Sequence, residues 1–153
     1  MSIKEKISYL GLSLPTAAAP VAAYVPAVKS GNLVFTAGQL PVVDGKLLNE
    51  GKVGSDVTAE EAKELAQICA LNALAAISLV ADLDQIERVV RVGGFVNCAP
   101  GFTAIPGVIN GASEFLIKIF GDVNGKHART AVGVSELPLN APVEVEVIVQ
   151  LKN

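Results

Sequence analysis

The sequence predicts an α+β fold in which one β-sheet carries two helices packed on one of its faces. The first observation is residues 143–151, where valine or leucine fills every second position, the pattern of a half-buried strand. The second is a capping box at Thr58–Glu61, which opens a long apolar helical stretch. The third is the order of the predicted elements, β-β-α-β-α-β-β, which favours a single sheet covered by helices on one side.

Length and composition set the broad class. The chain has 153 residues, which suits one domain with a core of its own. Hydrophobic residues make up 51% and charged residues 18%, and no apolar run approaches the roughly 20 residues of a membrane span. The surplus apolar surface therefore has to be buried in protein, which predicts self-association and no membrane partner.

Charge and cysteine content exclude several classes of protein. Residues 1–8 are charged and lack the apolar core of a signal peptide, so we expect a cytoplasmic protein. The two cysteines, Cys69 and Cys98, fit reduced thiols better than a disulfide framework. The net charge is −3 without a basic cluster, so no nucleic-acid partner is expected.

The first half of the chain contains a lead-in, a hairpin and the start of the first helix. Residues 2–10 predict a short helix that ends at Gly11. Residues 24–29 and 32–37 predict two strands joined at Ser30-Gly31. Gly38 follows the second strand and indicates either a simple turn, the commoner case, or a close approach of the backbone to another group.

The second half alternates strands and helices. The capping box predicts a helix from Thr58 to about residue 80, covered on more than one side because its apolar content exceeds one face. The remaining predicted elements are a strand at 86–96, a loop at 97–107, a helix at 108–120 ended by Gly121, and strands at 129–136 and 143–151.

Two glutamates interrupt the last strand. Period two puts Glu144 and Glu146 on the face opposite the valines. A buried carboxylate needs water or a cation, and Arg129 is the nearest candidate in sequence. Two alternatives stay open for Arg129: a structural ion pair with one of these glutamates, or a site that holds the carboxylate of a ligand.

No metal or nucleophile constellation is visible in the sequence. The cysteines lack the spacing of metal ligands, so no metal site is expected. His127 is the only histidine, and its proximity to Arg129 suggests a general base. A solvated histidine in a loop is the favoured interpretation, because most single histidines have no catalytic role.

Several motifs together resemble a known family. They are Tyr24, the run G-N-L-V-F-T-A-G-Q-L-P at 31–41, N-G-A-S-E-F-L from Asn110, Arg129, L-P at 137–138 and V-E-V-E-V from Val143. This combination resembles the Rid family of reactive-intermediate deaminases, also called the YjgF/YER057c/UK114 family and formerly endoribonuclease L-PSP. The resemblance spans about residues 19–151.

The resemblance implies a fold, an assembly and an activity. It implies a chorismate-mutase-like fold, with residues 1–153 as one Rid-family domain and residues 1–18 as an N-terminal extension. It also implies a homotrimer whose sheets form a central barrel with three clefts between subunits. The implied reaction is the hydrolytic deamination of enamines and imines, such as 2-aminoacrylate, to 2-keto acids and ammonia, without a cofactor.

The resemblance also assigns roles to individual residues. Arg129 would bind the substrate carboxylate with help from the backbone amide of Ala131. Glu144 would orient or activate the attacking water, and the backbone at Gly38 would meet the imine nitrogen. Tyr24 and Asn110 would line the pocket between subunits. These roles suit an imine carbon, which is already electrophilic and needs mainly orientation and a placed water.

Two other functions are compatible with parts of the sequence. A non-catalytic module that binds small carboxylates, such as a metabolite sensor, would use the same clefts and Arg129. A ribonuclease, as in the older family label, is disfavoured because an acidic chain with one histidine offers little to hold or cleave RNA.

Overall fold

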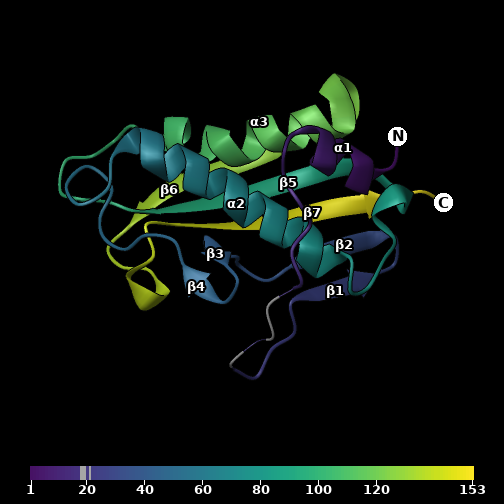
Figure 1. Cartoon of the computed structure of the whole chain (residues 1–153), viewed down its shortest axis with the longest axis horizontal. Helices are drawn as coiled ribbons and strands as arrows, with labels where there is room; N and C mark the ends of the chain where they lie inside the picture. The colour runs from purple at the N-terminus through teal and green to yellow at the C-terminus, as the bar shows by residue number, and fades with distance from the viewer. Residues whose placement is uncertain (18–19, 21) are drawn as a thin grey trace.

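The computed structural model describes residues 1–17, 20 and 22–153. Its helices and strands lie in two layers (Figure 1). The elements are α1 (Ile3–Tyr9), β1 (Ala27–Ser30), β2 (Leu33–Thr36), β3 (Val42–Val43), β4 (Lys46–Leu47), α2 (Ala59–Ile77), β5 (Ile86–Asn97), α3 (Ile105–Asn124), β6 (Ala128–Val134) and β7 (Val143–Leu151), with short 3-10 turns at Leu83–Gln85 and Pro138–Asn140.

One sheet organises the molecule. Its strand order is β1-β2-β7-β5-β6, so the last strand of the chain lies in the middle of the sheet. All neighbours are antiparallel except β5 and β6, which are parallel and joined through α3. The two long helices, α2 and α3, lie side by side across one face (Figure 1). The predicted sheet with two helices on one face is confirmed.

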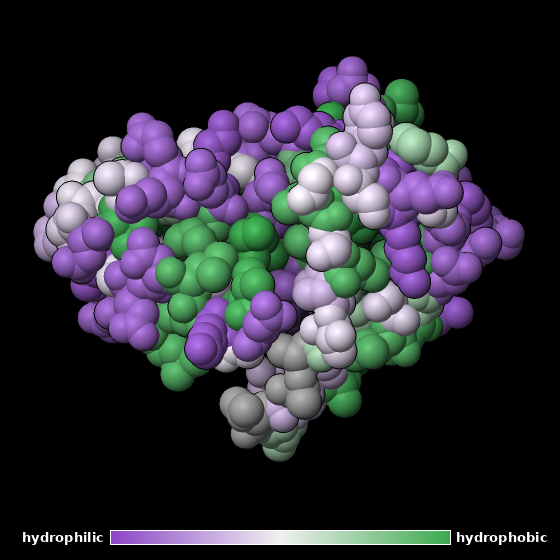
Figure 2. All heavy atoms as spheres, in the orientation of Figure 1, coloured by the Kyte–Doolittle hydropathy of each residue, from purple (hydrophilic) through white to green (hydrophobic). Residues whose placement is uncertain are grey.

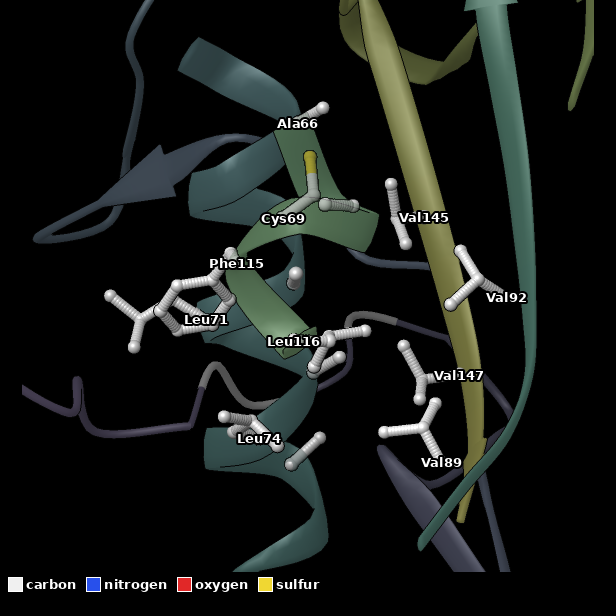
Figure 3. Close-up of a cluster of buried hydrophobic side chains, with 14 of the residues drawn as sticks. Ala66, Cys69, Leu71, Leu74, Val89, Val92, Phe115, Leu116, Val145 and Val147 are labelled. Carbon is white, nitrogen blue, oxygen red and sulfur yellow. The ribbon is translucent and has the colours of Figure 1, made fainter. Parts of the chain in front are cut away.

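The core lies between this sheet and the two helices. Figure 3 shows valines of β5 and β7 directed toward side chains of α2 and α3. The alternation of β7 is complete, because Val143, Val145, Val147, Val149 and Leu151 are buried while every residue between them is partly exposed. The helices pack closely at Gly111 of α3, where an added Cβ would lie 1.9 Å from the Lys63 carbonyl oxygen of α2.

Several boundaries differ from the predicted ones. Helix α3 begins at Ile105 rather than 108, because Pro106 occupies its first turn, where the missing N–H breaks no helical hydrogen bond. Gly121 interrupts the helix at φ 83°, as its predicted stop, but one further turn follows. Strand β1 begins at Ala27, so Tyr24 precedes the sheet instead of opening it. The small β3–β4 hairpin was not predicted, because each of its strands has two residues.

An irregularity in the pairing of β2 with β7 shapes the region after β2. Phe35 pairs with Ile148, whereas Gln39 bridges to Val145, so the β2 side contains one residue more than a regular ladder allows. The Thr36 hydroxyl accepts a hydrogen bond of 2.9 Å from the Val147 amide and replaces the interrupted ladder at this point. The extra residue brings the Gly38 backbone against β7.

The surface retains apolar groups on both sides of the molecule. Hydrophobic atoms are exposed among polar ones even on the helix side (Figure 2). No helix of the described residues covers the opposite face of the sheet, and Val28, Phe35 and Val132 are 51%, 40% and 39% exposed there. No helix in the described ranges is long and apolar enough to cross a membrane.

Candidate functional site

Arg129 lies on β6 and is directed toward α3. It is in register with Val92, whose side chain is fully buried on the helix side of the sheet. Its Nη1 donates to Asn110 Oδ1 at 2.8 Å and to Ser113 Oγ at 3.3 Å, and its Nη2 donates to the Pro106 carbonyl at 3.4 Å. Three acceptors on one helix therefore fix the guanidinium.

These three bonds leave part of the guanidinium open. A guanidinium has five N–H groups, and both hydrogens of Nη1 and one of Nη2 are directed at α3. In the described part of the chain, no residue accepts from Nε–H or from the second hydrogen of Nη2. Two N–H groups on a fixed guanidinium are suited to an incoming carboxylate.

Asn110 therefore supports Arg129, whereas the resemblance implies that it lines the pocket. Asn110 and Ser113 are three residues apart on α3, so both face β6. Ala131 lies two residues beyond Arg129 on β6, on the same face and partly buried. Because β6 is the edge of the sheet, its outer side has no neighbouring strand.

His127 extends this network. It lies in the loop before β6, as predicted, but it is half-buried and hydrogen-bonded instead of solvated. Its Nε2 lies 2.9 Å from Ser113 Oγ and its Nδ1 lies 2.6 Å from the Gly125 carbonyl oxygen. Burial lowers the pKa of His127, and the positive charge of Arg129 lowers it further, against the opposing effect of the Gly125 hydrogen bond. No role was predicted for Ser113. The available signals were the spacing of Asn110 and Ser113 on one helix, and the position of His127 two residues before Arg129 at the start of β6.

Glu144 forms a second part of the site with Gly38. A Cβ at Gly38 would lie 2.7 Å from Glu144 Oε1, so the carboxylate lies directly against the glycine backbone. Gly38 is thus a position of close approach, the less common of the two predicted alternatives. Glu144 is half-buried, and this burial raises its pKa, with a smaller contribution from the charge of Glu146.

A cavity of about 360 Å³ adjoins Gly38. Tyr24 lines it together with Gly38, and Leu40, Val42 and Pro26 contribute apolar walls. Asn72 of α2 holds the segment from Leu40 to Val42 in place beside this cavity. Its side-chain amide donates to the Leu40 and Val42 carbonyl oxygens at 3.0 and 2.9 Å. Tyr24 and Gly38 thus line the same cavity, whereas Glu144 contacts Gly38 but is not among the residues that line it.

The alternative of an ion pair between Arg129 and the β7 glutamates is wrong. Glu146 forms its ion pair with Arg91 of β5 at 3.5 Å, and Arg91 also donates to the Thr130 hydroxyl at 2.9 Å. Arg129 donates to α3 instead. It is directed to the helix side, because it is in register with a buried valine of the parallel strand β5.

Within one chain the predicted site residues thus form two groups. Arg129 and Ala131 lie on the edge strand β6 and face α3, which contributes Asn110. Glu144 is in register with Phe95 and faces the open side of the sheet, with β5 between its strand and β6. The structure brings Glu144 together with Gly38, and Arg129 together with Asn110, but it does not bring the two groups together.

No cluster of three or more histidine, cysteine or acidic residues that could hold a metal ion occurs in residues 1–17, 20 and 22–153. Cys69 is buried, and desolvation raises the pKa of its thiol well above the usual value. Cys98 is partly buried, and its pKa is raised for the same reason.

The mixed sheet, the paired helices and the position of Arg129 define an α+β protein of the chorismate-mutase-like type. The sequence matches the family described as "YjgF/chorismate mutase-like, putative endoribonuclease" over residues 4–151. The chain belongs to this family, which is the Rid family that its motifs resemble.

Individual relatives agree with this assignment. The chain is 41% identical to protein TCP17 of Trypanosoma cruzi over 99% of its own length and 95% of that protein. It is 31% identical to a 2-iminobutanoate/2-iminopropanoate deaminase of Dermatophagoides farinae, over 92% and 95% of the two chains. A crystal structure from Shewanella oneidensis superposes with a TM-score of 0.94 at 31% identity, covering 99% of this chain and all of that one.

Proposed function

We propose that the protein hydrolyses reactive imines of 2-keto acids and releases the keto acid and ammonia. The observation that carries the proposal is Arg129, whose guanidinium is fixed by three acceptors and keeps two N–H groups for a carboxylate. The deaminase from Dermatophagoides farinae, with 31% identity over nearly the full chain, supports the same reaction.

The second chemical group is Glu144. In the reaction, the water oxygen bonds to the imine carbon while Glu144 takes one proton from the water and passes it to the nitrogen, which gives a carbinolamine. Glu144 then transfers the remaining hydroxyl proton to the nitrogen as the carbon–oxygen double bond forms and the carbon–nitrogen bond breaks, so that the keto acid and ammonia are released. The raised pKa of Glu144 supports this role, because a base acts best when its pKa is close to the working pH.

The complete site requires a second copy of the chain. Arg129 and Glu144 face opposite sides of one sheet, so one substrate cannot contact both within a single subunit. We therefore place the site between subunits, with Arg129, Asn110 and the Ala131 amide from one copy and Tyr24, Gly38 and Glu144 from another. The exposed apolar side chains of the open face support contact between copies, in the homotrimer that the family motifs imply.

The test is ammonia release in a coupled assay, in which an amino-acid oxidase generates imines from several amino acids. The wild-type protein should accelerate the release, and Arg129→Ala should lower kcat/KM by a factor on the order of 30 or more, because a bidentate anchor contributes about 2–4 kcal/mol. Arg129→Lys is the matched control, since it keeps the charge but loses the planar pair of donors.

Equal rates for wild type and Arg129→Ala would contradict the proposal. A protein that binds 2-keto acids at Arg129 but accelerates no imine in the panel would instead be the non-catalytic binding module. Mixing Arg129→Ala with Glu144→Gln tests the shared site separately. Hybrid assemblies contain some clefts with both native residues, so activity should return in the mixture.

A further inference from the structure

His127, Ser113 and Arg129 form a chain of hydrogen bonds with one direction. The Gly125 carbonyl can only accept, so the nitrogen 2.6 Å from it, Nδ1 of His127, carries a proton. A neutral imidazole then has its lone pair on Nε2, which accepts from the Ser113 hydroxyl at 2.9 Å. The Ser113 oxygen keeps its lone pairs for Arg129, whose Nη1 donates at 3.3 Å.

The surroundings favour the neutral imidazole. Burial lowers the pKa of His127 below its usual value, so the ring is neutral at pH 7. A shallow pocket at His127 is lined by Ser113 and Ile117 of α3, Lys126 and Arg129, so both charged side chains that line it with His127 are cations. A positively charged imidazole would be repelled by them.

We propose that His127 is a positioning residue for carboxylate binding: it orients the Ser113 hydroxyl, which in turn holds the Arg129 guanidinium. The inference rests on the proposed role of Arg129 as the carboxylate anchor. Without His127, the Ser113 hydroxyl is free to rotate its hydrogen toward Arg129, which would replace an acceptor by a repelling donor. His127 does not itself contact the substrate.

This arrangement explains why the Arg129 side chain can be fixed at the edge of a sheet. Asn110 accepts one hydrogen of Nη1 at 2.8 Å, and Ser113 accepts the other. An amide oxygen is always an acceptor, whereas a hydroxyl becomes one reliably only when its own hydrogen is used elsewhere. Nε2 of His127 accepts the hydrogen of the Ser113 hydroxyl. Hydrogen bonds that form a chain also polarise and strengthen one another.

The first test uses nuclear magnetic resonance of the wild-type protein. His127 is the only histidine of the 153 residues, so its ring nitrogens are resolved without variants. At neutral pH the proton should reside on Nδ1. Saturating pyruvate, which offsets the Arg129 charge, should raise the pKa of His127, and Arg129→Ala should raise it without a ligand. A proton on Nε2 at neutral pH would overturn the proposal.

The second test separates binding from chemistry. In Ser113→Ala, KM should rise roughly five- to tenfold while kcat stays within about twofold, because the lost contact acts on the carboxylate anchor. Ser113→Thr keeps the hydroxyl and should stay near wild type. His127→Phe should repeat the effect of Ser113→Ala. Wild-type KM in a folded Ser113→Ala variant would overturn the proposal.

The failure of this inference and that of the proposed function are distinguishable. Pyruvate affinity, measured by calorimetry, needs no turnover. Weaker pyruvate binding by Ser113→Ala in a protein that hydrolyses no imine would support the positioning role and reject the deaminase. Unchanged pyruvate binding by Ser113→Ala in an active deaminase would reject the positioning role and support the deaminase.

Discussion

Glycine has different roles in the helix layer and on the open face of the sheet. On the helix side, a Cβ at Gly111 would lie 1.9 Å from a backbone oxygen, the Lys63 carbonyl. On the open side, a Cβ at Gly38 would lie 2.7 Å from Oε1 of Glu144, the end of a flexible side chain. The backbone cannot yield, whereas the carboxylate can move. The helix-side glycine is therefore required for packing, and the open-side glycine positions a chemical group.

Burial shows the same difference between the faces. The helix-side residues of β7 are buried valines, matched by fully buried side chains such as Leu74 and Leu116. The open side combines exposed Val28 and Phe35 with the carboxylates of Glu144 and Glu146. One face is complete within a single chain, whereas the other presents apolar and charged groups together. This pattern is typical of a surface used for contact and binding.

The largest expected effect is on the helix side. Gly111→Ala should lower the free energy of unfolding by about 3 kcal/mol, because the methyl group forces α2 and α3 apart. For a chain of this length that corresponds to a decrease in Tm of about 6–12 °C, measurable by calorimetry.

The matched control lies in the same helix. Gly107 of α3 has no atom within 4 Å of an added Cβ. Gly107→Ala should therefore raise stability by up to about 1 kcal/mol through helix propensity alone. Equal destabilisation by both substitutions would show that close packing at Gly111 is not the reason.

A smaller effect, on activity instead of stability, is expected from Gly38→Ala. The methyl group displaces the Glu144 carboxylate, and we expect roughly a tenfold decrease in kcat/KM, which is about 1.4 kcal/mol. Stability should change by less than about 1 kcal/mol, because a flexible side chain can move away. Rates come from the coupled ammonia assay and stability from urea unfolding.

A double-mutant cycle shows whether Gly38 acts through Glu144. In a Glu144→Ala background, the methyl group at position 38 has no carboxylate to displace, so it should cause no further loss of activity. An additional tenfold loss in that background would mean that Gly38 affects the substrate directly, through the backbone contact that the family motifs imply.

The predictability of the two faces from sequence also differs. Period two in β7 identified the buried valines and the opposite position of Glu144 and Glu146, because alternation along a strand depends on backbone geometry alone. Partners across the sheet were not predictable. The pairing of Glu146 with Arg91 depends on the register of β5 with β7, which no local pattern encodes.

The arrangement of the candidate site residues was not predictable from the sequence. The family motifs single out Arg129 and Glu144 as candidates, but their opposite directions follow from the pairing of β5 with β6 and with β7, a long-range property. The network of Ser113 and His127 was missed for a similar reason. Each residue is ordinary in its own segment, and they meet only when α3 packs beside β6.

The smallest expected effect concerns the stability contribution of Glu144. Because burial raises its folded pKa, this carboxyl binds a proton more tightly in the folded than in the unfolded chain. Folded stability therefore falls as pH rises from the unfolded pKa of about 4.3 through the raised folded value. Glu144→Gln should unfold like wild type at acidic pH and should be slightly more stable above the folded pKa, although it is less active.

Urea unfolding at a fixed protomer concentration, across pH values from about 4 to 8, measures this difference. Glu146→Gln is the comparison on the same strand, because it removes an ion pair with Arg91 near the surface and should lower stability by less than about 1 kcal/mol. A constant difference between Glu144→Gln and wild type at every pH would show that the carboxylate is not destabilising.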